Sequence, residues 1–235
     1  MTPAAFAELA SQVPATFRFV VKALETATVA VFPRHERYGP QAGQANPRFL
    51  DPDPVADELV RPALAGLGPA LGPIVFQLPP QPPAHLGGPA RFGMRLRAFL
   101  RGLPSGPTYA VELRNRELVG PDVARVLADC GAVPCLTVHP AMPPVDVQAG
   151  ALATPAGPLV VRWMLGGGRE YEAARERYMP FDRLVDPDPI TRAAIVALIG
   201  GARRAGHAAW VVINNKAEGS APASVVELAR ALAAA

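Results

Sequence analysis

Short apolar runs that are rich in β-branched residues alternate along this chain with longer segments of helical spacing. Each run is apolar almost throughout, as in strands buried on both faces, and the alternation with helices predicts a parallel sheet. The six predicted strands are 17–22, 74–78, 108–114, 133–138, 158–163 and 208–213. The predicted helices are 6–12, 54–67, 88–100, 121–130, 188–205 and 223–232.

Two α/β architectures have this order of elements, an open doubly wound sheet and a TIM-type (β/α) barrel. No G-x-G-x-x-G follows a predicted strand and no Walker A motif occurs, which counts against a nucleotide-binding open sheet. Residues 26–54 form a long polar stretch, and a loop of this length inside a domain is typical of a lid or a binding loop.

Composition narrows the class of protein further. The 235 residues are 50% hydrophobic, enough for the core of one domain over residues 1–235. The net charge is only +3 and the charges are scattered, so a large nucleic-acid-binding face is not implied. No apolar stretch is long enough to span a membrane, and residues 1–10 lack the pattern of a signal peptide. Cys130 and Cys135 form no disulfide framework or metal motif and fit buried, reduced thiols in a cytoplasmic protein.

Polar side chains stand at the carboxyl end of each predicted strand. Because these ends gather on one face of a parallel sheet, we expect a shared pocket there, with structural ion pairs as the alternative. The strand-end residues are Lys22, Gln77, Glu112, Arg114, His139, Arg162, Asn214, Asn215 and Lys216. With Glu112 and Glu218 as the only countercharges, this pocket would be cationic and would favour a small anionic ligand such as a phosphate or carboxylate.

Roles within this pocket follow from residue type. Glu112 is the predicted acid/base group because it lies on a strand, and Lys22 is the second catalytic candidate, as a charge stabiliser. Gly167, Gly168 and Ser220 are candidate phosphate-binding residues, in a glycine-rich loop and at a helix start, with an ordinary turn and a simple helix cap as the alternatives. The predicted substrate-binding residues are Gln77, Arg114, Arg162, Asn214, Asn215 and Lys216. We expect no metal and no cofactor, since the histidines show no metal-binding spacing.

The chain also resembles a known family, the YecE-like domain of unknown function (number seventy-two of that series). The segments that carry the resemblance are 17–22 (FRFVVK), 37–39 (RYG), 46–51, 67–68, 76–80 (FQLPP), 112–114 (ELR), 161–162 and 214–222 (NNKAEGSAP). The resemblance covers nearly the whole chain and implies a TIM-type barrel with no assigned activity. The family's shared polar residues match Lys22, Gln77, Glu112, Arg114, Arg162, Asn214 and Asn215.

The resemblance also implies that part of the barrel is missing. Family members begin with two further βα units, with a Gly-Thr-Ser-Gly-Trp-like first strand and a V-E-x-N-like end to the second, and residues 17–22 match the third strand. We therefore expect an incomplete barrel of about six parallel strands, units three to eight, with two unpaired edges. A misassigned start codon, which we favour, a decayed gene and a partner chain that fills the gap are the three explanations.

Three interpretations of function follow. The first is a protein that binds or acts on a phosphorylated or otherwise anionic small molecule, with catalysis left open. The second is a nucleic-acid- or nucleotide-binding module without turnover, which uses the same cationic face and the loop at Arg34 to Arg37. The third is a non-functional barrel fragment. None of the three interpretations predicts an oligomeric state.

Overall fold

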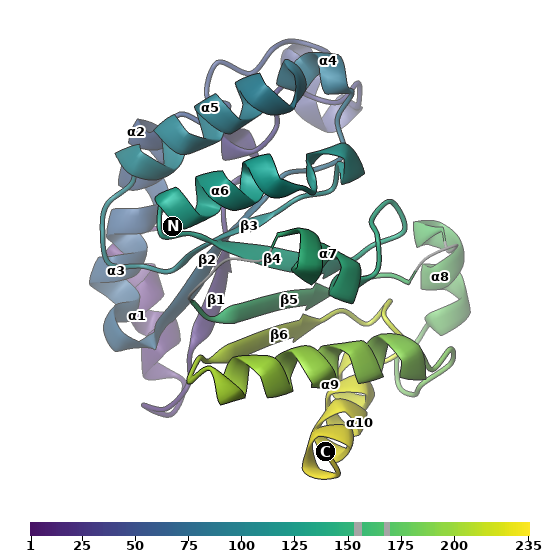
Figure 1. Cartoon of the computed structure of the whole chain (residues 1–235). Helices are drawn as coiled ribbons and strands as arrows, with labels where there is room; N and C mark the ends of the chain where they lie inside the picture. The colour runs from purple at the N-terminus through teal and green to yellow at the C-terminus, as the bar shows by residue number, and fades with distance from the viewer. Residues whose placement is uncertain (153–156, 167–169) are drawn as a thin grey trace. The chain divides into compact units, whose positions relative to one another are not determined.

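The structure is a computed structural model that describes residues 1–152, 157–166 and 170–235 (Figure 1). Its strands are β1 (Phe19–Lys22), β2 (Leu71–Gln77), β3 (Tyr109–Glu112), β4 (Val133–Val138), β5 (Leu159–Trp163) and β6 (Ala209–Ile213). The α-helices of the described residues are α1 (Pro3–Ser11), α2 (Pro52–Val55), α3 (Arg61–Leu67), α4 (Pro83–Leu86), α5 (Gly88–Gly102), α6 (Pro121–Asp129), α7 (Val145–Ala151), α8 (Tyr171–Tyr178), α9 (Pro189–Arg204) and α10 (Ala221–Ala233).

The strands are parallel and follow one another in chain order from β1 to β6, with helices in the connections. This order never reverses, which excludes the doubly wound alternative, because a doubly wound sheet has a point at which its strand order turns back. The predicted incomplete TIM-type barrel is therefore confirmed. None of the helices that the structure describes is long and apolar enough to cross a bilayer.

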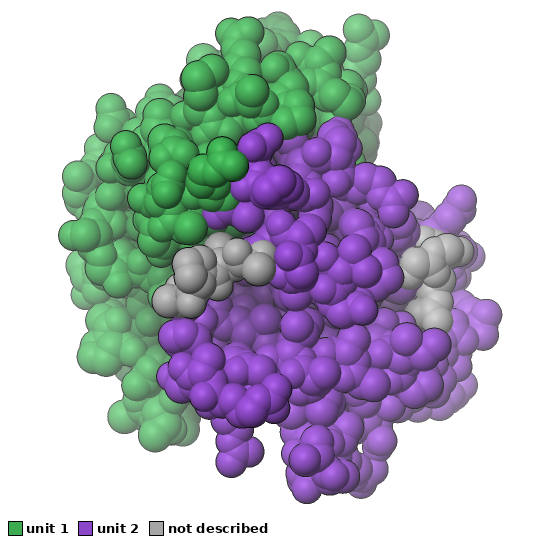
Figure 2. All heavy atoms as spheres, in the orientation of Figure 1, with its two compact units in different colours: residues 1–112, 125–132 green, residues 113–124, 133–235 purple. Residues whose placement is uncertain are grey.

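The chain divides into two compact units (Figure 2). Unit 1 consists of residues 1–112 and 125–132, and unit 2 of residues 113–124 and 133–235. Each unit is built around one half of the strand order, β1-β2-β3 in unit 1 and β4-β5-β6 in unit 2.

Unit 1 has its core on β2, whose residues from Gly72 to Phe76 are all buried. The Phe76 ring meets the ring of Phe99 from α5 edge to face, with 4.9 Å between centroids. Helix α1 packs on α3 so closely that a Cβ at Gly66 would lie 2.3 Å from the carbonyl oxygen of Pro3. Only glycine allows this contact, so the helix pair depends on that residue.

The long connection after β1 is fixed to unit 1 by two buried amide side chains. Gln81 accepts the backbone N–H of Ala30 at 2.6 Å and donates to the carbonyl of Thr28 at 3.2 Å. Asn46 donates from Nδ2 to the carbonyls of Thr26 and Val29, both at 2.7 Å. Buried backbone polar groups need hydrogen-bond partners, and these two side chains supply such partners to the loop.

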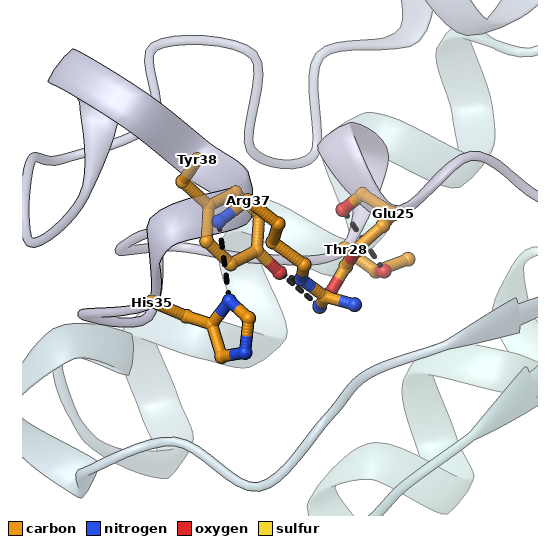
Figure 3. Close-up of polar contacts among 5 residues, drawn as sticks. All are labelled: Glu25, Thr28, His35, Arg37 and Tyr38. Carbon is orange, nitrogen blue, oxygen red and sulfur yellow. Dashed lines mark hydrogen bonds and ion pairs between the residues drawn. The ribbon is translucent and has the colours of Figure 1, made fainter.

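A polar cluster closes this connection at its surface (Figure 3). The Tyr38 phenol donates to Glu25 Oε1 at 2.7 Å, and Arg37 donates to Tyr38 Oη and lies 2.8 Å from Glu25 Oε1. Burial, followed by the hydrogen bond to Glu25, raises the pKa of Tyr38, and the hydrogen bond to Tyr38, followed by the Glu25 charge, raises the pKa of Arg37. His35 Nδ1 accepts the backbone N–H of Arg37. The cluster ties the turn at 36–41 to Glu25, in the short turn that follows β1.

Unit 2 packs one face of β4-β5-β6 against helices, with α7 on β4 and α9 on β5 and β6, as Figure 1 shows. Side chains alternate between the two faces of a strand. Leu136, Val161 and Trp163 belong to the core cluster shared with the helices. Thr137 and Arg162, neighbours in the β4–β5 register, therefore lie on the opposite face.

Candidate functional site

A pocket of about 260 Å³ lies within unit 2 at the carboxyl ends of its strands. The first residue after each strand lines it, His139 after β4, Met164 after β5 and Asn214 after β6. The remaining lining residues are Arg114, Pro140, Leu165, Tyr171 and Lys216. His139, Met164 and Asn214 each follow a strand residue that packs on the helices. Because side chains alternate between the faces of a strand, these three point to the opposite face.

Backbone hydrogen bonds fix the walls of this pocket. The Val138 carbonyl accepts both the Met164 and the Leu165 N–H at 3.2 Å, which ties the ends of β4 and β5 together. The Asn214 N–H donates to the Trp163 carbonyl at 2.8 Å and ties β6 to β5 in the same way. The pocket therefore rests on the sheet rather than on loops alone.

Two polar side chains of the pocket have their hydrogen-bonding roles set by the protein. Asn214 Oδ1 accepts the N–H of Lys216 at 2.9 Å, which leaves the Nδ2 group of Asn214 as its donor to a ligand. His139 Nδ1 accepts the N–H of Ala141 at 3.2 Å, which holds the imidazole ring beside the pocket. Asn214 thus presents an N–H donor, which suits an anion, and His139 lies in the same pocket.

Lys216 is the charged centre of the pocket. Its Nζ lies 4.1 Å from the ring centroid of Tyr171, the first residue of α8, and 5.9 Å from that of Phe181. Ammonium–aromatic contacts of this kind hold a charge without neutralising it. Among the described residues, no carboxylate forms an ion pair with Lys216, and none of those that line the pocket is acidic.

Glu218, which we expected as a countercharge in the pocket, is instead buried elsewhere. Its side chain is 0% exposed, and Oε1 lies 2.5 Å from Arg192 Nη2 and accepts the N–H of Asp188 at 2.7 Å. Its backbone carbonyl accepts the N–H of Val185 and of Asp186. Glu218 therefore anchors the start of α9 and does not reduce the charge of the pocket.

The turn before α10 is organised by Asn215. Its Oδ1 accepts the N–H of Ala221 at 2.8 Å, at the first turn of the helix. Ser220 occupies the N-cap position, but its hydroxyl makes no capping hydrogen bond. Ser220 is buried and is not among the described lining residues of the pocket, so its role as a phosphate-binding residue stays a prediction. Gly167 and Gly168 lie outside the described residues.

The other predicted residues are placed as follows. Arg162 lies within β5, paired with Thr137 and Val212, and is not a lining residue of the pocket. In unit 1, Gln77 and Glu112 are register partners at the ends of β2 and β3, and Glu112 is fully buried. Lys22 is exposed at the end of β1.

The structure thus brings together Arg114, Asn214 and Lys216 of the predicted substrate-binding residues, with His139 beside them. Sequence reasoning missed Tyr171 and Phe181. The only signal was the spacing of Tyr171, Ala174 and Tyr178 in a segment too highly charged to suggest a helix. Within the described parts of the chain, no three His, Cys, Asp or Glu side chains are grouped to hold a metal ion.

Comparison with solved structures supports the fold. The chain is similar to a DUF72 family protein from Thermotoga maritima, with a TM-score of 0.62 and 17% identity over 99% of this chain and 80% of that one. Two structures of a DUF72 family protein from Enterococcus faecalis match with TM-scores of 0.61 and 0.60, at 16% and 15% identity, over 99% of this chain and 80% and 85% of theirs. At these identities the likeness shows the fold alone.

No curated protein matches the sequence. The model of one family, described as "Protein of unknown function DUF72", matches residues 1–235. The match spans the strand-end motifs from Phe17–Lys22 to the Asn214–Ser220 turn, and the chain therefore belongs to the DUF72 family.

Proposed function

We propose that the unit 2 pocket binds a small molecule through an anionic group, a phosphate or a carboxylate. The observation that carries the proposal is Lys216, an ammonium held over the Tyr171 ring at 4.1 Å with no acidic residue among the described lining. The guanidinium of Arg114, the imidazole of His139 and the side-chain amide of Asn214 line the same space. These groups match the charge and the hydrogen-bond acceptors of a phosphate or carboxylate.

The identity of the central cation adds support. Of the 23 lysines and arginines in the chain, only Lys22 and Lys216 are lysines. The chain places arginine almost everywhere else, although the two residues differ, since the lysine ammonium is a compact charge with three donors. A lysine at this position fits an oxyanion that approaches one point of charge.

The pocket favours a small ligand over a polynucleotide. At about 260 Å³ it accommodates one anionic group with a modest substituent. Nucleic-acid binding depends on a series of phosphate contacts along the strand. Glu112 stays our candidate for an acid/base group and Lys22 for charge stabilisation, but the binding proposal depends on neither. A cytoplasmic location stays part of the proposal, since both thiols are free.

Calorimetric titration with inorganic phosphate tests this proposal. A charged hydrogen bond contributes about 1.5–3 kcal/mol, so Lys216→Ala should raise the Kd by about tenfold to a hundredfold. Lys216→Arg keeps the charge and should weaken binding less. Arg230→Ala removes an exposed cation of α10 that pairs with Glu227, and should leave the Kd unchanged.

The two lysines also allow a chemical test with an internal control. Pyridoxal phosphate, an anionic aldehyde, followed by borohydride reduction should label Lys216 and the exposed Lys22. Added phosphate should protect Lys216 and not Lys22, as read by peptide mass spectrometry. Equal labelling of both with and without phosphate, together with a Kd that Lys216→Ala leaves unchanged, contradicts the proposal. Tighter binding of longer oligonucleotides with a steep salt dependence would favour the nucleic-acid interpretation instead.

A further inference from the structure

A second cavity of unit 2 adjoins the anion pocket. It has a volume of about 450 Å³ and lies between the loop after β4, the start of α7 and the first turns of α9. Its walls are mainly apolar, with Val138, Met142, Val145, Ile190 and Ala194 among its lining residues. Among the residues that the structure describes, the lining of this second cavity differs from that of the anion pocket with one exception.

That exception is His139, which lines both spaces. The backbone also joins the two spaces. Val138 lines the second cavity, and its carbonyl accepts the N–H groups of Met164 and Leu165, which line the anion pocket. A ligand whose anionic group contacts Lys216 therefore has an apolar space next to it, on the other side of one imidazole.

Charge orients such a ligand. The second cavity has a carboxylate, Asp146, and no lysine or arginine among its described lining residues. The anion pocket has Lys216 and Arg114, and none of its described lining residues is a carboxylate. An anion is thus favoured in one space and disfavoured in the other.

We propose that the ligand of this protein is amphipathic, an oxyanion that carries an apolar tail, with its anionic group in the pocket of Lys216 and its tail in the cavity of Met142 and Ala194. This inference rests on the proposed function and names the class of molecule that the same site takes. His139 lies at the junction, where the anionic group of such a ligand is joined to its tail.

The test compares methyl phosphate with hexyl phosphate by calorimetry on the full chain. Each methylene that leaves water contributes about 0.8 kcal/mol, or about fourfold in Kd, so two or three buried methylenes should make hexyl phosphate about 15- to 60-fold tighter. Hexanol, which lacks the anionic group, should bind weakly.

A substitution at the rim of the second cavity tests its role in binding without affecting folding. Ile190 is 82% exposed, so Ile190→Asp should not disturb folding. The added carboxylate should cancel most of the gain of hexyl phosphate and leave methyl phosphate unchanged. Val225→Asp, at a residue 50% exposed on α10, is the matched control and should change neither. Ala194→Leu, which narrows the cavity from within, should act like Ile190→Asp.

The outcomes separate the two proposals. If methyl phosphate binds through Lys216 but hexyl phosphate binds no tighter, the amphipathic ligand is refuted and the anion pocket stands. If hexyl phosphate is tighter but Ile190→Asp and Ala194→Leu leave the gain intact, the tail lies elsewhere and the inference is again refuted. If the wild type binds neither methyl nor inorganic phosphate, the proposed function fails, and this inference with it.

Discussion

The ion pair between Glu218 and Arg192 leads to our most specific prediction for the stability of unit 2. Glu218 is 0% and Arg192 14% exposed, and the pair uses one oxygen, Oε1, which also accepts the N–H of Asp188. Glu218 Oε2 and Arg192 Nε are buried without a hydrogen-bond partner among the described residues. The desolvation of both charges is therefore only partly compensated.

From this geometry, removal of one partner should cost far more than removal of both. Glu218→Gln leaves the Arg192 guanidinium buried without a countercharge, which costs about 3–5 kcal/mol in comparable buried pairs. In a domain of this size that corresponds to a Tm lower by roughly 6–20 °C. Arg192→Met should cost a similar amount, and the double variant should recover at least about 2 kcal/mol of the summed loss, because two neutral side chains need no pairing.

The assay is urea unfolding followed by tryptophan fluorescence. The chain has two tryptophans, Trp163 on β5 and Trp210 on β6, so the signal reports on unit 2. Glu227→Gln breaks the exposed pair with Arg230 and is the control, with an expected loss of about 0.5 kcal/mol or less. The reasoning is refuted if Glu218→Gln and Glu227→Gln have the same midpoint, or if the losses of the single variants simply add.

Two further predictions concern a glycine and a tyrosine. A Cβ at Gly219, where φ is +118°, would lie 2.7 Å from the carbonyl oxygen of Arg183, so Gly219→Ala should lower the free energy of unfolding by more than about 2 kcal/mol. Gly131→Ala, at a positive φ with open space around it, should cost only about 1 kcal/mol in the same urea assay. Burial raises the pKa of Tyr109 from 10.0 to about 12, and its phenol donates to the carbonyl of Pro104 at 2.5 Å. In the unfolded chain Tyr109 ionises at a lower pH than in the folded protein. The contribution of its neutral phenol to the free energy of unfolding is therefore complete below pH 10 and is lost as the pH rises toward 12. Tyr109→Phe should lack this decline, and equal pH profiles of the two proteins would contradict the prediction.

The strands could be predicted from the sequence because their signal is local. All six apolar runs became strands, and β4 has the predicted bounds, since an apolar run that is buried on both faces carries its own pattern. The same locality placed His139 and Asn214, each of which directly follows a strand. Once a strand end is known, the residue after it is known as well.

Helix α8 was not predicted, and the reason is physical. Its sequence, YEAARERY, is half charged and buries only Ala174 and Tyr178, so no apolar stripe is visible. The contact between Tyr171 and Lys216 joins residues far apart in the sequence and depends on where α8 packs. Glu218 was misplaced for a related reason, because its partner Arg192 lies 26 residues earlier and the local pattern shows only a polar loop.

The placement of Glu218 also has a consequence for the order in which unit 2 can be assembled during synthesis. The N–H groups of Val185, Asp186 and Asp188 and the guanidinium of Arg192 are all bound by Glu218, a residue that the ribosome adds later. Until that residue emerges, Arg192 has no anion and the amides of Val185 and Asp186 have no acceptor from that turn. The chain before α9 therefore lacks these contacts in the nascent protein. The turn between β6 and α10 has to be synthesised before this part of unit 2 can fold completely.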